Sequence, residues 1–276
     1  MFWCDATRFG PEIPFSFLIF LESLLIYTVI KAEAAPLLSL AIFLGFASLA
    51  HAGPADYVYT PIVEQGEKEV DYKLGTTKAS NGTRTSVTSL GFGYGVNSWW
   101  FTELYIKAKR ESPDGWRYDA VEWENKFQLT ETGKYPVDIG FIVEIERPRD
   151  RAEGYEVRFG PLLQAELTSS VVANANLLFS KNYQSVIPVQ MKLDYQWQLR
   201  YRLKPEFEVG AQGFGSLGPW QRWFPGDQQE HKLGPAVFGK VRLDSHSAIK
   251  YNAAWLVGVN NNTPRNTFRL QTEYEF

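Results

Sequence analysis

The stretch "VQMKLDYQWQLRYRL", Val189 to Leu203, decides the fold class of this chain. Apolar and aromatic residues occupy every odd-numbered position in it, and amide or charged residues occupy every even-numbered one. Strict alternation over this length predicts an extended strand with one apolar face and one charged face. In a soluble sandwich the apolar face points inward, whereas in a membrane barrel it points outward to lipid. Alternation alone does not choose between these two arrangements.

The composition narrows the class of protein. The chain has 276 residues, a length that allows one large β domain or two small ones. Of these residues 45% are hydrophobic and 15% are aromatic, and aromatic residues favour strands. The single cysteine, Cys4, excludes a disulfide framework. The formal net charge of −3 and the lack of a basic stripe argue against a nucleic-acid partner.

The N-terminus has the composition of a leader. An apolar run over 15–30 is followed by Lys31 and by a second apolar run over 36–50 that continues into "AHAG". A positive residue, an apolar core and small residues predict a secretory signal peptide that is cleaved after Ala52. The part before Lys31 has no role in such a signal, which suggests a true start codon further downstream. The alternative is a transmembrane helix over 15–30, although this run is short for a span of ~20 residues and contains Glu22.

The leader, 1–52, is therefore expected to precede a single β domain, 53–276. This domain shows repeated alternation and no helical periodicity longer than a turn or two. The predicted strands are 67–76, 84–96, 99–110, 117–130, 136–147, 154–167, 171–181, 189–203, 206–214, 233–243, 247–259 and 266–276.

The connections between these strands alternate in length. Every second connection is short, as at 204–205, and the others are longer or more polar, the longest being 215–232. Short turns at one end and longer loops at the other are typical of a bacterial outer-membrane barrel. An even number of strands then predicts that both mature termini lie in the periplasm.

A closed barrel also accounts for the apolar faces. The strands have one apolar face each, and no segment is left over that would cover those faces in a soluble domain. Closing the sheet, with polar groups inside and lipid outside, removes the edges and the apolar faces together. We therefore predict an all-β fold, a transmembrane antiparallel up-and-down barrel of about 12 strands in the bacterial outer membrane.

The chain ends in "FRLQTEYEF", with apolar or aromatic residues at Phe268, Leu270, Tyr274 and Phe276. This ending resembles the C-terminal signal by which bacterial outer-membrane barrels are recognised for assembly. The resemblance implies that the last strand is a partner of the barrel-assembly machinery. It also implies that the outer surface contacts membrane lipid and lipopolysaccharide.

The charged face of the opening stretch is expected to line the interior, because each Lys or Arg on the lipid face costs about 2–4 kcal/mol. A tight turn at 204–205 predicts a register with Arg202 across from Glu206 and Arg200 across from Glu208.

The predicted lumen mixes charges of both signs. Its lining residues are Lys192, Asp194, Arg200, Arg202, Glu206, Glu208, Glu144, Glu156, Arg158, Lys240, Arg242 and Arg269. This mixture indicates paired charges across the interior rather than a selectivity filter of one sign.

The long loop 215–232 contains "GPWQRWFPGD" and so offers Trp220, Arg222, Trp223 and Phe224. Two placements fit these residues. They fold into the pore mouth and contact a solute, or they rest on lipopolysaccharide or on the barrel rim.

No catalytic constellation is evident, so an enzyme is not expected. His51 lies in the leader, His246 in a predicted short turn, and His231 at the end of the long loop without a neighbouring serine motif. The chain resembles the twelve-strand outer-membrane phospholipase in size but lacks its His–Ser–Asn pattern. Clustered His or Cys ligands for a metal are absent, and no cofactor is expected. The glycines of "GFGYGVN", 91–97, lie in a predicted strand, where they permit curvature or close packing rather than form a phosphate loop.

These observations favour a channel for small hydrophilic solutes. One alternative is a non-conducting barrel that supports the envelope or a partner protein. The other is an outer-leaflet lipid-modifying enzyme.

Overall fold

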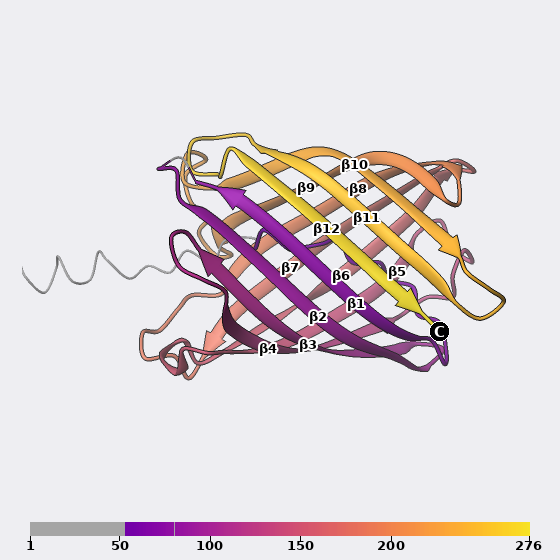
Figure 1. The fold of residues 1–276 in the computed structure, drawn as a ribbon, viewed down its shortest axis with the longest axis horizontal. Helices are drawn as coiled ribbons and strands as arrows, with labels where there is room; N and C mark the ends of the chain where they lie inside the picture. The colour runs from indigo at the N-terminus through magenta and orange to yellow at the C-terminus, as the bar shows by residue number, and fades with distance from the viewer. Residues whose placement is uncertain (1–52, 80) are drawn as a thin grey trace, which may run out of the picture. The chain divides into compact units, whose positions relative to one another are not determined.

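Twelve antiparallel strands close into one β-barrel in a computed structural model, which describes residues 53–79 and 81–276 (Figure 1). Each strand pairs with its neighbours in sequence, and β1 pairs with β12 to close the sheet. The strands are β1 (Lys68–Lys78), β2 (Arg84–Asn97), β3 (Trp100–Glu111), β4 (Arg117–Gln128), β5 (Asp138–Pro148), β6 (Tyr155–Thr168), β7 (Val171–Tyr183), β8 (Lys192–Lys204), β9 (Phe207–Pro219), β10 (Glu230–Arg242), β11 (Ala248–Gly258) and β12 (Asn266–Glu275). The predicted fold class and number of strands are confirmed.

The alternation in β8 resolves which face points inward. Gln196 and Gln198 are 4% and 6% exposed, whereas Leu199 and Tyr201 are 44% and 47% exposed. The polar side chains therefore point into the barrel and the apolar ones point out of it, which is the arrangement of a membrane barrel.

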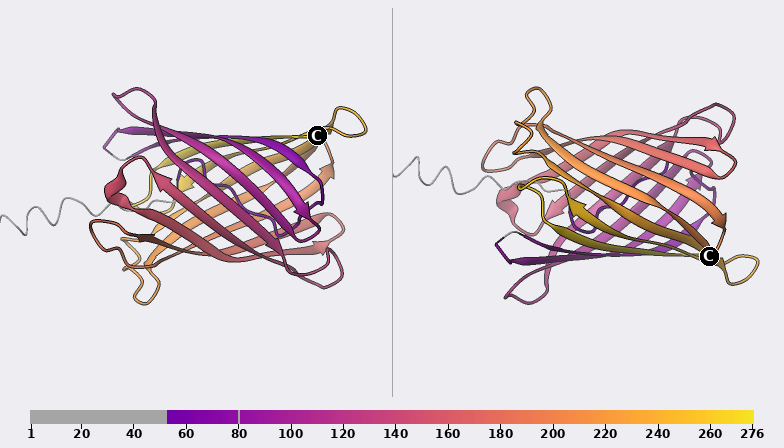
Figure 2. Two further views of the ribbon diagram at one scale, coloured as in Figure 1. Left: turned by 90° about the horizontal axis from the view of Figure 1, so that it is seen from below. Right: turned by 90° about the horizontal axis from the view of Figure 1, so that it is seen from above.

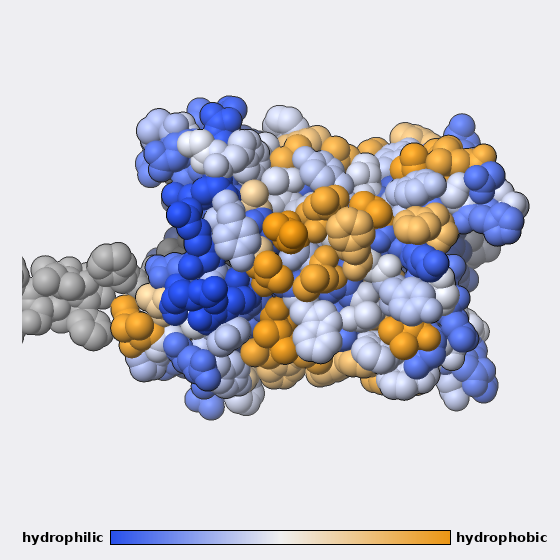
Figure 3. Space-filling model, turned by 60° about the horizontal axis from the view of Figure 1, so that its bottom comes forward, coloured by the Kyte–Doolittle hydropathy of each residue, from blue (hydrophilic) through white to orange (hydrophobic). Residues whose placement is uncertain are grey.

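The outer face carries a band of large apolar side chains. Phe92, Ile106 and Trp255 are each more than half exposed, although they lie well inside their strands. Figure 3 shows hydrophobic residues gathered over the middle of one face of the barrel and hydrophilic residues at its ends. Burial in lipid is the arrangement that removes this apolar surface from water.

The predicted leader, 1–52, lies outside the described residues. In the described part of the chain, 53–79 and 81–276, no helix has the length and apolarity needed to cross a membrane.

The two rims of the barrel differ. We call the rim where β1 begins and β12 ends the short-turn rim, and the opposite rim the long-loop rim. The short-turn rim carries the two-residue connections 98–99, 169–170 and 205–206, but its connection 129–137 is longer than predicted. The longest connection, 220–229, lies at the long-loop rim.

That longest connection is shorter than the predicted loop 215–232, because β9 continues to Pro219 and β10 begins at Glu230. The extension was missed because Gly213 and Gly215 interrupt the alternation. Both glycines lie on the outward face of β9, where the rings of Trp197 and Tyr195 from β8 cover them. A Cβ at Gly215 would lie 2.3 Å from the Tyr195 ring, so the neighbouring strand supplies the side chains that β9 lacks here.

The predicted register between β8 and β9 is wrong by two residues. Arg200 lies across from Gly210 and not from Glu208. The turn closes between Lys204 and Phe207, and an irregularity follows between Tyr201 and Lys204. Because the turn lies further along the chain than predicted and has a bulge beside it, every residue pair between β8 and β9 beyond the bulge is shifted.

An extended stretch, residues 53–67, runs inside the barrel, and we call it the luminal segment. Its indigo trace lies within the outline of the barrel in both views of Figure 2. Lys232, near the start of β10, donates to the Gly53 carbonyl at 3.0 Å, and the Val63 N–H donates to Oε1 of Gln128, the last residue of β4, at 2.7 Å. The segment therefore crosses from the long-loop side to the short-turn rim. It turns there at Gly66, whose φ of 79° favours glycine, and enters β1.

This path places Gly53 and the C-terminus toward opposite rims of the barrel, while the position of the mature N-terminus in the periplasm stays a prediction. The first strand begins and the last strand ends at the same rim, where the Phe276 N–H donates to the Lys68 carbonyl at 3.0 Å. Gly53, however, lies toward the opposite rim, because the luminal segment runs back through the barrel.

Candidate functional site

Two tyrosines attach the luminal segment to one wall of the barrel. The Tyr57 hydroxyl donates to Oε2 of Glu124 on β4 at 2.7 Å, and the Tyr59 hydroxyl donates to Glu144 on β5. Asn176 on β7 donates to the Tyr59 carbonyl at 3.1 Å. Hydrogen bonds to charged groups contribute about 1.5–3 kcal/mol each, so these contacts hold the segment in one position.

Apolar contacts fix the segment on both sides. Val58 packs in a cluster that includes Phe214 and Phe238, while Tyr59 packs with Ile142 and Leu162. These wall residues are almost fully buried at inward positions of their strands. Apolar residues on the lumen face are the signal of an occupied lumen that sequence reasoning missed. A water-filled lumen would be lined by polar side chains at these positions.

Glycines in the wall make room for the segment. A Cβ at Gly75 on β1 would lie 2.0 Å from the Pro54 carbonyl oxygen, and a Cβ at Gly140 on β5 would lie 2.8 Å from the Pro61 Cβ. Real Cβ atoms do not approach other atoms so closely, so side chains there would displace the segment. The sequence and the backbone are therefore matched to an occupied lumen.

Lys73 on β1 is held between aromatic rings of the segment and the wall. Its Nζ lies 3.4 Å from the ring centroid of Tyr57 and 3.7 Å from that of Tyr105. Its ion-pair partner, Asp71, lies 3.2 Å away. An ammonium between two aromatic faces is a cation–π arrangement, which strengthens when water is excluded.

Carboxylates cover the inner wall from β12 to β6, and we call this surface the acidic wall. Adjacent strands align them in two parallel rows across the sheet. The first row holds Glu275, Glu69, Glu103, Glu124 and Glu144, and the second holds Glu273, Asp71, Glu122, Glu146 and Glu156. Among the described residues the buried charged side chains are nine acids and three bases, so the buried lumen is mainly acidic.

Basic side chains pair with part of the acidic wall. Lys107 lies 2.6 Å from both Glu122 and Glu146. Arg158 lies 3.6 Å from Glu144 on the neighbouring strand. Each such pair offsets part of the desolvation of its carboxylates.

The residues predicted to line the lumen fall into three groups. The pairs Arg158–Glu144, Arg158–Glu156, Arg200–Glu208 and Lys240–Glu275 are ion pairs of inward side chains. Arg269 is 1% exposed and donates to Gln212, while Lys192 and Asp194 are half-buried. Arg202 pairs with Glu166 at 2.7 Å instead of Glu206, and Glu206 and Arg242 are exposed at the short-turn rim.

The aromatic loop residues do not enter the lumen. Trp220 packs edge-on against Phe179, an outward residue of β7, with ring centroids 6.1 Å apart. Arg222 and Trp223 are exposed, and Phe224 packs over Gly218. The placement of Trp220 on the barrel rim is therefore the one that the structure has.

The C-terminal residues lie on the outer face of β12. Phe268, Tyr274 and Phe276 are 40–52% exposed, and the rings of Tyr274 and Phe276 stack 5.6 Å apart. Leu270 lies on the same face and is half-buried. This face is available to lipid or to the proposed assembly machinery.

His231 makes no contact with a serine among the hydrogen bonds of the described residues. Its Nδ1 lies 2.8 Å from the Tyr195 hydroxyl and its Nε2 lies 3.0 Å from the Gln229 side-chain oxygen. His246 does lie beside Ser245, at 2.7 Å, but both are exposed in the turn after β10. Neither arrangement forms a nucleophile, base and orienting group in a pocket.

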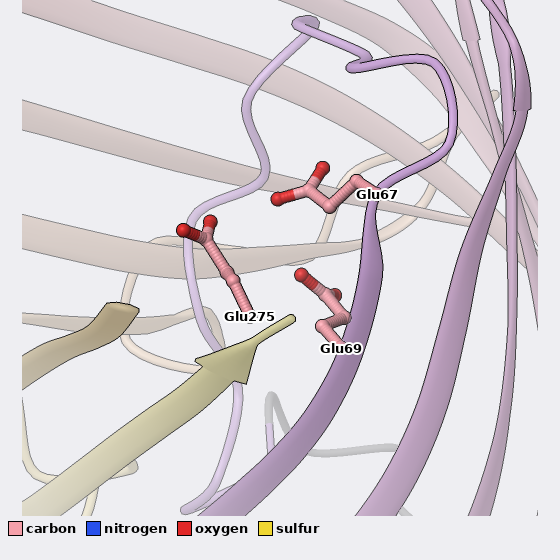
Figure 4. A group of neighbouring side chains, drawn as sticks. All are labelled: Glu67, Glu69 and Glu275. Carbon is pink, nitrogen blue, oxygen red and sulfur yellow. The ribbon is translucent and has the colours of Figure 1, made fainter. Parts of the chain in front are cut away.

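A cavity of about 330 Å³ lies beside the luminal segment, toward the short-turn rim. Figure 4 shows the carboxylates of Glu67, Glu69 and Glu275 close to one another. Glu67 and Glu69 also line the cavity. The ammonium of Lys250 lies 3.2 Å from the Glu67 carboxylate. Because Lys250 also pairs with Glu275, lysine already supplies positive charge to this cluster, and we assign no metal to it.

Comparisons with known proteins support the fold. No known protein-family profile and no curated protein matches the sequence. Among solved structures, the KdgM porin is 8% identical with a TM-score of 0.50, over 75% of this chain and 99% of that chain. The NanC porin is 11% identical with a TM-score of 0.51, over 75% and 100%. The COG4313 outer membrane channel from Pseudomonas putida F1 is 14% identical with a TM-score of 0.51, over 82% and 99%.

At these identities the likeness shows the fold alone. The chain therefore has the fold of the bacterial outer-membrane β-barrel class, as its alternating strands predicted.

Proposed function

We propose that this protein is a bacterial outer-membrane channel for small hydrophilic solutes and that its own luminal segment closes it in the state described here. The observation that carries this proposal is the polar lumen, crossed by residues 53–67 on side-chain contacts rather than as a strand of the sheet. The apolar outer band and the solved channels of the same fold support the membrane location. In this proposal the short-turn rim faces the periplasm.

The filled lumen also favours the second candidate, a non-conducting barrel. The two functions differ in whether the segment leaves the lumen. Few hydrogen bonds and ring contacts hold the segment, and each contributes only about 1–3 kcal/mol. These contacts can therefore break and re-form. We therefore favour a channel that opens when the segment moves.

Weakening the two tyrosine anchors tests the choice. The double substitution Tyr57→Phe with Tyr59→Phe removes two hydroxyls and keeps the ring packing, so the barrel still folds while the segment is held less firmly. We expect liposomes with this variant to swell faster in small neutral sugars than liposomes with the unaltered protein.

The control is Tyr94→Phe, which makes the same change on the outer face, where Tyr94 is 45% exposed. It is expected to leave the swelling rate unchanged. If neither the double variant nor a chain without the luminal segment permits swelling, the barrel is non-conducting and the channel proposal is wrong.

A further inference from the structure

The cavity beside the luminal segment contains more negative than positive charge. Eight acidic and four basic residues line it. Of the basic ones, Arg200 pairs with Glu208, Lys240 with Glu275, and Lys250 with Glu67 and Glu273. These three basic residues are therefore in ion pairs, the fourth, Lys126, lies over the Phe101 ring, and carboxylates remain in excess.

Two of these carboxylates are buried without a hydrogen bond or an ion pair, although Glu69 is attracted to Lys126 and Glu103 to Lys73. Glu69 and Glu103 are 9% and 3% exposed, and within the described chain neither makes a hydrogen bond or an ion pair. Oε1 of Glu103 is fully buried and unsatisfied. A buried carboxylate without a hydrogen bond or an ion pair is costly, and a cation bound in the cavity would offset that cost.

Glycine keeps the space between these carboxylates open. In the sheet, Gly93 on β2 lies between Glu69 on β1 and Glu103 on β3. A Cβ at Gly93 would lie 2.8 Å from Cγ of Glu69, and a Cβ at Gly91 would lie 2.4 Å from Oε1 of Glu103. The glycines of "GFGYG" therefore admit both carboxylates, which gives the packing predicted for them a specific purpose.

Aromatic rings complete the lining of the cavity. Tyr57, Phe101 and Tyr105 all contribute to it. The same rings already bind two lysine ammonium groups, since Lys73 lies between Tyr57 and Tyr105, and Lys126 lies 4.8 Å from the Phe101 ring centroid. Carboxylates combined with aromatic faces bind organic ammonium groups in other sites.

We propose that this cavity binds a small organic ammonium solute, with its positive charge at Glu69 and Glu103. The volume of about 330 Å³ corresponds to roughly ten water molecules at ~30 Å³ each. That space suits a small organic amine and is larger than a bare metal ion needs. The site adds a class of solute, organic cations, to the proposed function. The claim that such cations pass through the barrel rests on the channel proposal.

Calorimetric titration of the full-length barrel in detergent tests the inference, with 1,4-diaminobutane as the probe. We expect one diamine to bind, and 1,4-butanediol, the uncharged analogue, not to bind. The double variant Glu69→Gln with Glu103→Gln is expected to bind the diamine at least about tenfold more weakly, because the isosteric amides remove the charge.

The control Glu131→Gln, at an exposed position in the 129–137 connection, is expected to bind as the unaltered protein does. Folding of each variant is checked by its electrophoretic migration before and after heating. Absence of diamine binding, or equal binding by the double variant, would overturn the inference. Binding of calcium without binding of the diamine would also overturn it, in favour of a metal site.

The binding measurement is independent of conductance. If the diamine binds but no variant conducts, the channel proposal fails and the ammonium site stands. If the protein conducts but the diamine does not bind, the ammonium site fails and the channel proposal stands.

Discussion

Removal of residues 54–65 is expected to convert a closed barrel into one that conducts steadily in planar bilayers. The unaltered protein should show little current or brief openings, because Tyr57, Val58 and Tyr59 connect opposite walls of the lumen. Without the segment, water and ions replace it beside the acidic wall. A twelve-strand barrel is intermediate between small filled barrels and wide porins, so the open lumen admits small solutes.

The matched control shortens the connection 184–191 at the long-loop rim, outside the luminal segment. This variant is expected to conduct like the unaltered protein. Equal currents from the unaltered protein and the chain without 54–65 would show that the segment does not close the barrel.

The second large effect concerns the outer face. Leu199, near the middle of β8, is 44% exposed and is expected to face the hydrocarbon core of the bilayer. Leu199→Arg should lower the free energy of unfolding from lipid vesicles by about 2–4 kcal/mol. The physical reason is that lipid solvates a guanidinium far less well than water does.

The control for this substitution is the same change at a different depth in the bilayer. Leu203→Arg makes the same change on the same face at the end of β8, where the expected loss is only about 0–1 kcal/mol. Denaturant titration in vesicles measures both variants. Equal effects at the two positions would mean that the outer face of β8 does not lie in lipid.

The fold was predictable because alternation is a local property of each strand. In β8 and β12 the sequence alone separates the two faces, and the boundaries agree within a few residues. The end of β9 was not predictable, since Gly213 and Gly215 carry no side chains and depend on rings from β8. The register predicted from a turn at 204–205 is wrong because a single bulge, which has no clear sequence signal, shifts the pairing of β8 and β9.

The occupied lumen could not be derived from periodicity, because the luminal segment has none. The sequence indicates an occupied lumen only indirectly. These indications can be interpreted only once the closed barrel shows which residues face the lumen. Ile142 and Leu162 occupy lumen-facing positions that a water-filled channel would leave polar. Gly75 and Gly140 leave room for a backbone that belongs to a distant part of the chain.

The most direct test of this account is a cross-link between the luminal segment and the wall. In a chain with Cys4→Ser, which removes the single native cysteine, Tyr57→Cys is combined with either Glu124→Cys or Trp123→Cys. Glu124 points into the lumen toward Tyr57, whereas Trp123, its neighbour on β4, is 48% exposed on the outer face. A short bis-maleimide should link position 57 to 124 and not to 123, as measured by mass spectrometry of proteolytic peptides. Linkage to 123, or none to 124 in the folded barrel, would contradict a segment that lies inside a barrel with its polar face inward.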